Sequence, residues 1–176
     1  MQRGILYLLV EGKDDELFCE RLLSRCFSKV FDDIRIIQWA EKSAGTVNKL
    51  LLSFQDKEYP YIFFGDFRRL CITGTKQDLA HIYEALDLSQ ILVVVKEIEG
   101  WYIAGLDDAA CERLGIPRMN RTDDLGKKRF MSMMPARYET VIEFMLAIID
   151  EYSFEVARSK NTLLSHLLDK YGICNA

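Results

Sequence analysis

The chain has 176 residues, of which 49% are hydrophobic and 28% are charged, and its formal net charge at pH 7 is -4. These values fit one compact soluble domain, or one domain with a helical extension. An acidic chain has no global electrostatic attraction for nucleic acid or for an anionic membrane, so any binding of either must be local.

The cysteines and histidines argue against several common kinds of site. The five cysteines form no CxxC pair and are odd in number, so we expect a reduced, cytoplasmic chain in which they fill the core. His81 and His166 lie far apart in the sequence, which leaves little for a zinc site or a Ser-His-Asp triad. The N-terminus lacks the pattern of a signal peptide, and the longest later apolar run, 144–149, is too short to span a membrane.

Short apolar runs alternate with helical patterns through the first part of the chain, as in βαβ units. The predicted strands are 5–10, 34–38, 61–64 and 91–95, and the predicted helices between them are 14–29, 46–54 and 75–86. Ser43 is expected to cap the second of these helices. The fold class is therefore α/β, with a four-stranded, mainly parallel sheet flanked by helices.

Beyond Glu99 no further β-branched run occurs, and helical periodicity takes over. The predicted helices are 101–106, 107–114 with Asp107 as cap and Gly115 as stop, one bearing Lys127 to Arg129, one starting near Pro135 with Tyr138 and Ile142 on its inward stripe, and 161–171 with Asn161 as cap. We predict an α/β core over 1–106 and a helical extension over 107–176, packed on the core as a single compact unit.

Three of the predicted strands run directly into acidic residues. Strand 5–10 is followed by Glu11, Asp14 and Asp15, strand 61–64 by Asp66, and strand 91–95 by Glu97 and Glu99. The carboxyl ends of parallel strands share one edge of a sheet, where ligands bind. Glu97 and Glu99 point the same way if their segment stays extended. Several carboxylates in one place repel one another, so Glu11, Asp15, Asp66, Glu97 and Glu99 are candidate ligands of Mg²⁺ or Mn²⁺.

The segment 10–18, VEGKDDELF, resembles the first motif of the Toprim family, in which Glu-Gly is followed by an acid that opens a helix. The spacing to Asp66 is also similar to that family, which includes topoisomerases, primases, recombination-repair proteins and overcoming-lysogenization-defect nucleases. The segment 96–102, KEIEGWY, resembles an acidic-aromatic motif of prokaryotic Toprim-like proteins. The resemblance implies a Rossmann-like sheet over the first part of the chain, with Glu11 as general acid or base and Asp66 as a catalytic residue that holds Mg²⁺.

The chain departs from the family pattern at Arg68, which stands where a second aspartate is usual. In one interpretation Glu97 or Glu99 supplies the missing ligand. In another, Arg68 and Arg69 form an ion pair with the acidic cluster, and the site holds no metal. Asp14 and Glu16 have a simpler interpretation as charges favoured at the start of a helix.

A basic stretch from Arg113 to Arg137 holds seven basic residues against two acids. It could face the phosphates of DNA or RNA, with Arg68, Lys127, Lys128 and Arg129 as candidate contacts, or it could be a solvated helix face. Trp101 and Tyr102 could stack on a base or could belong to the core.

Three functions remain open from the sequence. The first is a Mg²⁺-dependent protein that acts on nucleic-acid phosphodiester bonds, as a nuclease does. The second is a module without catalysis that binds nucleic acid or a protein partner in a larger system. The third is a receiver-like domain in which Asp66 accepts a phosphoryl group and Lys96 follows the fourth strand. None of these requires a membrane, and the sequence leaves the oligomeric state open.

Overall fold

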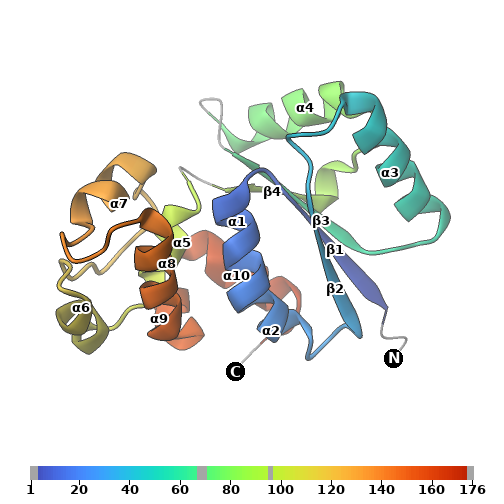
Figure 1. Cartoon of the computed structure of the whole chain (residues 1–176). Helices are drawn as coiled ribbons and strands as arrows, with labels where there is room; N and C mark the ends of the chain where they lie inside the picture. The colour runs from blue at the N-terminus through green and yellow to red at the C-terminus, as the bar shows by residue number, and fades with distance from the viewer. Residues whose placement is uncertain (1–3, 67–70, 95–96, 174–176) are drawn as a thin grey trace. The chain divides into compact units, whose positions relative to one another are not determined.

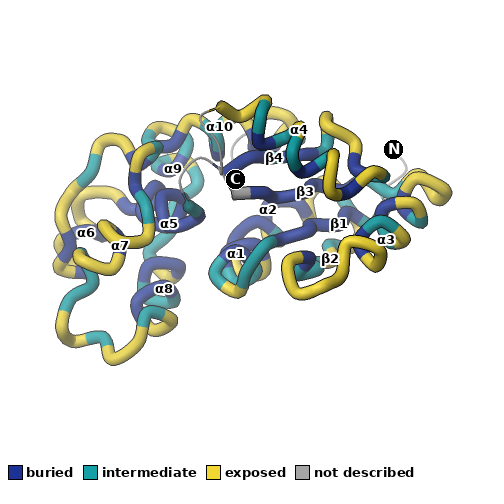
Figure 2. Tube along the Cα trace, turned by 90° about the horizontal axis from the view of Figure 1, so that it is seen from above, coloured by how far each residue is buried: buried dark blue, intermediate teal, exposed yellow. Residues whose placement is uncertain are grey.

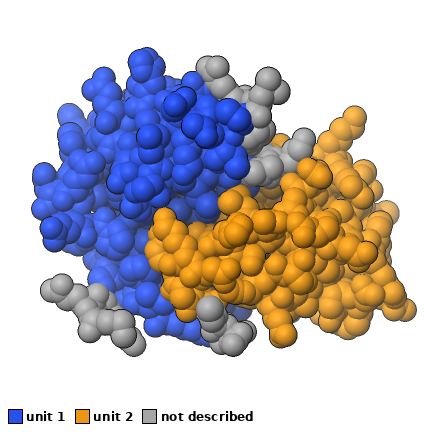
Figure 3. Space-filling model, turned by 180° about the vertical axis from the view of Figure 1, so that it is seen from behind, with its two compact units in different colours: residues 1–94 blue, residues 95–176 orange. Residues whose placement is uncertain are grey.

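The protein is described by a computed structural model that covers residues 4–66, 71–94 and 97–173, with the backbone alone at Asp66. The chain divides into two compact units, Met1–Val94 and Val95–Ala176, which Figure 3 colours separately. This division falls earlier in the chain than the predicted boundary after residue 106. Helix α5 (Glu99–Ala104) contacts later helices and so belongs to the second unit.

The first unit contains a four-stranded sheet in the order β2-β1-β3-β4, and every neighbouring pair of strands is parallel. Its strands are β1 (Ile5–Val10), β2 (Asp33–Gln38), β3 (Tyr61–Asp66) and β4 (Ile91–Val94). The predicted four-stranded parallel sheet is therefore confirmed (Figure 1). Strand β2 lies at one edge and is partly exposed, whereas the interior strand β1 is buried along almost its whole length (Figure 2).

The crossover segments are helical, as predicted. The first contains α1 (Lys13–Phe18), a π-helical turn (Cys19–Leu23) and α2 (Ser24–Phe27), and the other two are α3 (Ala44–Asp56) and α4 (Ile72–Ile82). Ser43 caps α3 because its Oγ accepts a hydrogen bond from the Thr46 N–H at 3.2 Å. Figure 1 shows α3 and α4 on one face of the sheet and α1 and α2 on the other.

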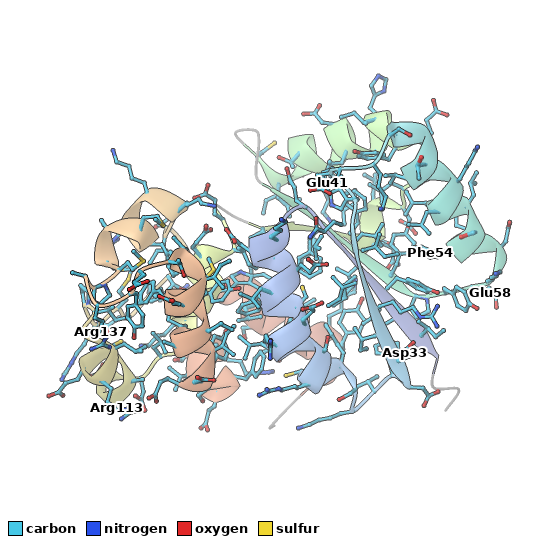
Figure 4. The ribbon with its side chains drawn as sticks, in the orientation of Figure 1. Asp33, Glu41, Phe54, Glu58, Arg113 and Arg137 are labelled. Atoms are coloured by element: carbon cyan, nitrogen blue, oxygen red, sulfur yellow. The ribbon has the colours of Figure 1, made fainter. Side chains whose placement is uncertain are left out.

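Alternation along the strands builds the core of the first unit. Tyr7, Leu9 and Phe63 face one way and pack with Leu51 and Phe54 of α3. The rings of Tyr7 and Phe54, the latter labelled in Figure 4, are stacked with their centroids 4.2 Å apart. Each fully buried apolar side chain of this kind contributes about 1.5–3 kcal/mol. The strands that precede the acidic residues are therefore anchored in a buried core.

The second unit is helical, and none of its described residues forms a strand. Its helices are α5 (Glu99–Ala104), α6 (Asp108–Leu114), α7 (Lys127–Met133), α8 (Val141–Asp150), α9 (Phe154–Lys160) and α10 (Thr162–Lys170). Every residue of α5 is buried, and this helix contacts α7, α8 and α9. Across the described segments, no helix combines the length and apolar character needed to cross a membrane.

The predicted helix ends were largely correct. Asp107 caps α6 by accepting a hydrogen bond from the Ala110 N–H at 2.7 Å, and Gly115 ends that helix with a φ of 69°. Asn161 caps α10 through the Leu164 N–H at 3.1 Å. Helix α9 was not predicted, although Ser153, which accepts from the Val156 N–H at 3.4 Å, is the kind of cap that signals a helix start.

The prediction near Pro135 was wrong. Pro135 starts a turn, because its carbonyl accepts from the Tyr138 N–H at 3.1 Å, and α8 begins only at Val141. A capping box between Thr140 and Glu143 fixes that start. Ile142, which was predicted to face inward, is 60% exposed, because the buried face of α8 is formed by Phe144, Met145, Ile148 and Ile149, and Ile142 lies to one side of it.

The cysteine prediction holds for three of the residues. Cys19, Cys26 and Cys111 are buried, and burial raises the pKa of each thiol above its ordinary value. Cys71 is exposed instead, because its Sγ accepts from the Gly74 N–H at 3.2 Å and caps α4. Cys174 lies outside the described residues.

The close approach at Gly100 gives a first testable prediction. A Cβ on this residue would lie 2.7 Å from the Thr122 carbonyl oxygen, a backbone atom that cannot rotate away. We expect Gly100→Ala to lower the free energy of unfolding by about 1–3 kcal/mol, measured by urea denaturation. The matched control is Gly45→Ala in α3, where no atom lies within 4 Å of the added Cβ. This control should leave stability unchanged or raise it by up to about 1 kcal/mol.

Candidate functional site

The first motif forms a tight junction between β1 and α1. Glu11 follows the last residue of β1 and is half-buried, and Gly12 stands at the N-cap of α1 with an extended backbone. The Gly12 N–H donates a hydrogen bond to Oδ2 of Asp15 at 2.9 Å. Asp15 therefore closes the turn that Glu11 begins, and the two carboxylates belong to one local structure.

Asp15 is the most perturbed acid of this junction. Its residue is 8% exposed, and its pKa is raised from 3.8 to about 6, chiefly because burial disfavours the charged form. The hydrogen bond from Gly12 lowers this pKa, whereas the carboxylates of Glu11 and Asp14 raise it further. Ionising Asp15 beside Glu11 and Asp14 therefore costs free energy, and a bound cation would lower that cost.

Asp66 ends the strand next to β1. Strands β1 and β3 are parallel with Leu9 opposite Phe63, so Glu11 and the backbone of Asp66 come at the same edge of the sheet. The indole Nε1–H of Trp39 donates to the Phe64 carbonyl at 2.9 Å and anchors this strand end. The structure thus brings the backbone positions of Glu11 and Asp66 to one edge, as predicted.

Three predicted features at this edge lie outside the description. The side chain of Asp66, the whole of Arg68 and the whole of Lys96 are not among the described residues. The two interpretations of Arg68, as replacement for a ligand or as partner of the acids, stay predictions.

The neighbouring acid Glu16 has a structural contact. The amide Nε2 of Gln38, at the end of β2, donates to Oε2 of Glu16 at 2.5 Å. This bond ties the first turn of α1 to the sheet and supports the interpretation of Glu16 as a helix-start charge.

The donors that Glu11 and Asp15 offer are carboxylate oxygens, which suit Mg²⁺ or Mn²⁺. Within residues 4–65, 71–94 and 97–173, whose side chains are described, no group of three or more His, Cys, Asp or Glu side chains could hold a metal ion. The chemistry of the donors and the raised pKa of Asp15 fit a cation. A full ligand set would need Asp66 or another acid.

Glu97 and Glu99 do not lie on an extended segment, so the condition under which they were expected to point the same way is not met. Glu99 begins α5, and its side chain is 3% exposed. Its Oε1 lies 3.7 Å from Nζ of Lys127, and a carboxylate oxygen of Glu97 accepts a hydrogen bond from the backbone N–H of Lys127. Both acids thus contact the first residue of α7. Metal ligation by either of them stays a prediction.

Trp101 and Tyr102 belong to the core of the second unit. Their residues are 1% and 0% exposed, and the ring centroid of Tyr102 lies 6.2 Å from that of Phe130. The core interpretation is therefore confirmed, and neither ring is available to a nucleic-acid base.

Most of the basic stretch is used within the second unit. Arg113 pairs with Glu151 at 2.5 Å, Arg118 with Asp108 at 3.1 Å, and Arg121 with Asp123 at 2.6 Å. The hydrogen bond from Arg113 lowers the pKa of Glu151. Burial opposes the lowering of the pKa of Asp123, which comes first from the Thr162 backbone N–H and then from Arg121.

The remaining basic residues differ from one another. Arg137 donates to the Arg113 carbonyl at 2.9 Å and lies over the ring of Tyr138, and Figure 4 labels both arginines. Lys128 and Arg129 are exposed, and neither has an ion-pair partner among the described residues. Fewer exposed basic side chains without an ion-pair partner therefore remain among the described residues than the sequence suggests, and their role as nucleic-acid contacts stays a prediction.

Comparison with known proteins gives one structural likeness. No protein-family model matches the chain, and no curated protein matches it. The chain is structurally similar to the C-terminal region of the OLD protein of Xanthomonas campestris pv. campestris, with 16% identical residues and a TM-score of 0.44. The match covers 97% of this chain and 96% of that one.

Proposed function

We propose that the protein is a Mg²⁺-dependent enzyme that acts on nucleic-acid phosphodiester bonds. The observation that carries this proposal is the buried carboxylate of Asp15, whose pKa is raised to about 6 beside Glu11. Strongly perturbed acids at a ligand-binding edge are typical of functional sites. A purely structural helix-start acid is usually solvated, and its pKa is lowered by the helix dipole rather than raised.

Glu11, Asp15 and Asp66 are the proposed ligands, with Glu97 or Glu99 as a further candidate. When bound, Mg²⁺ or Mn²⁺ would supply a water of lowered pKa and neutralise charge on the phosphate. Glu11 would act as general acid or base, and Asp15 would be held ionised by the cation.

The nucleic-acid contacts proposed from the sequence are Arg68, Lys127, Lys128 and Arg129. Lys128 and Arg129 have the strongest support, because they are exposed cations without an ion-pair partner among the described residues. A chain with so small a basic surface would be helped by a protein partner that brings further contacts to the nucleic acid.

The test is a cleavage assay with labelled single- and double-stranded DNA and RNA, each incubated with Mg²⁺, with Mn²⁺ or with EDTA. We expect cleavage of at least one substrate with a divalent ion and none with EDTA. Calorimetry should show a divalent ion binding to the wild type. If no ion binds and no substrate is cut, the enzyme proposal is wrong.

A second candidate is a module that binds without catalysis. It is favoured by Arg68 in the position of a second aspartate and by the lack of a three-residue metal group among the described side chains. This candidate predicts binding of nucleic acid that is the same in EDTA and in Mg²⁺, with intact substrate recovered from both.

A further inference from the structure

A cleft of about 440 Å³ lies in the second unit beside α7. Lys127, Lys128, Arg129 and Ser132 of α7 line it, together with Glu97 and Asp124. This volume is within the usual range for pockets that hold a small ligand or one unit of a larger one. Most of the residues that line it carry charged or polar groups, which suits a ligand that itself carries charge.

Lys127 is committed to the structure of the second unit. Its Nζ pairs with the buried carboxylate of Glu99 at 3.7 Å, and its backbone N–H is bound by Glu97. Gly126 permits this approach, because a Cβ there would lie 3.0 Å from Oε2 of Glu97. The contacts of Glu97 and Glu99 with Lys127 fix the start of α7. Because Glu97 accepts from the Lys127 N–H, this first N–H of the helix is unavailable to a ligand.

Lys128 and Arg129 therefore supply the positive charge that an anion in the cleft can use. Both side chains are exposed and line the cleft, and no acid among the described residues pairs with either. Their neighbours Arg113, Arg118 and Arg121 are all paired. An ammonium and a guanidinium that line the same cleft are suited to phosphate oxygens.

We propose that this cleft binds a phosphate group of a nucleic-acid strand through Nζ of Lys128 and the guanidinium of Arg129. Lys127 is a positioning residue: its contacts with Glu97 and Glu99 fix the start of α7, and so the places of Lys128 and Arg129. Asp124 places a negative charge in the same cleft and weakens the binding. That the ligand is a nucleic acid rests on the proposed function. That Lys127 positions α7 while Lys128 and Arg129 bind the anion does not rest on it.

The test is the binding of fluorescein-labelled single- and double-stranded DNA and RNA to the full chain in EDTA, over a series of salt concentrations. Lys128→Ala and Arg129→Ala should each weaken binding about 5- to 10-fold and lower the salt slope by about 1. Asp124→Asn should tighten binding about 2- to 5-fold, because it removes a repulsion from the same cleft. Arg118→Gln, which removes one positive charge away from the cleft, should change binding less than about 2-fold.

Lys127→Ala distinguishes the positioning role from a ligand role. Its loss should lower the unfolding temperature as well as the affinity, whereas Lys128→Ala should leave the unfolding temperature unchanged. Equal binding by wild type and the Lys128 and Arg129 variants would overturn the proposal, as would equal losses in Arg118→Gln or undetectable binding by the wild type. If the cleft proposal fails but the wild type still cleaves nucleic acid, the proposed enzyme function is unaffected. If Lys128 and Arg129 bind nucleic acid but the wild type cleaves none, only the enzyme function is wrong.

Discussion

Glu11→Gln is expected to lower metal-dependent cleavage of nucleic acid at least about 100-fold, because a positioned acid or base contributes a factor of that order. Glutamine has the same shape as glutamate but can neither accept a proton nor ligate a cation with a full negative charge. The measurement is the single-turnover rate of cleavage with Mg²⁺, on whichever substrate the wild type cuts.

The matched control is Glu16→Gln, in the first turn of the same helix. It removes one negative charge from the same part of the unit, and glutamine can still accept a hydrogen bond from Gln38. We expect its cleavage rate to remain within about 3-fold of the wild type, since Glu16 has no proposed catalytic role. Comparable losses in both variants would mean that total charge, rather than Glu11, matters.

Asp15→Asn is expected to stabilise the protein at pH 7.5, by up to about 3 kcal/mol. The folded pKa of Asp15 is about 6, above the value of 3.8 for an unperturbed aspartate, so the folded state holds the proton more tightly than the unfolded state does. The stability that the protonated form contributes is complete below about pH 3.8 and is lost as the pH rises through about 6. Asparagine mimics the protonated form at every pH.

Urea denaturation of both proteins at several pH values between 4 and 8 tests this prediction. The difference in unfolding free energy should be small near pH 4 and should grow until about pH 7, because other titrating groups cancel in the comparison. Saturating Mg²⁺ should stabilise the wild type more than the variant if the cation binds beside Asp15. A difference that does not change with pH would mean that the pKa of Asp15 is not raised by folding.

The sheet could be predicted because its signals are local. Each strand is a short β-rich run, and the helices between strands carry an apolar face that the sequence displays directly. Caps such as Asp107 and Asn161 were also predictable, because the residue type and its place before an apolar stretch determine the hydrogen bond. At Pro135 the same reasoning failed, because Pro135 is the first residue of a turn and the Thr140–Glu143 capping box sets the start of α8 instead.

The candidate site was less predictable, because which of its charged side chains form ion pairs depends on residues far away in the sequence. Arg113 and Glu151 are 38 residues apart, and no local pattern signals that they pair. Glu97 and Glu99 follow a strand, yet the second of them starts a helix and both turn to Lys127. The sequence places acids and bases in order along the chain, whereas tertiary structure decides which of them neutralise one another.

Each compact unit contains one of the two tryptophans of the chain. Trp39 is 4% exposed and is hydrogen-bonded to the strand that ends at Asp66, and Trp101 is 1% exposed within α5. Buried indoles emit at short wavelength and shift to the red when water reaches them. Trp101→Phe would therefore leave an intrinsic fluorophore that reports on the first unit alone, and Trp39→Phe would do the same for the second. The two variants make the unfolding of each unit separately visible in a single optical titration.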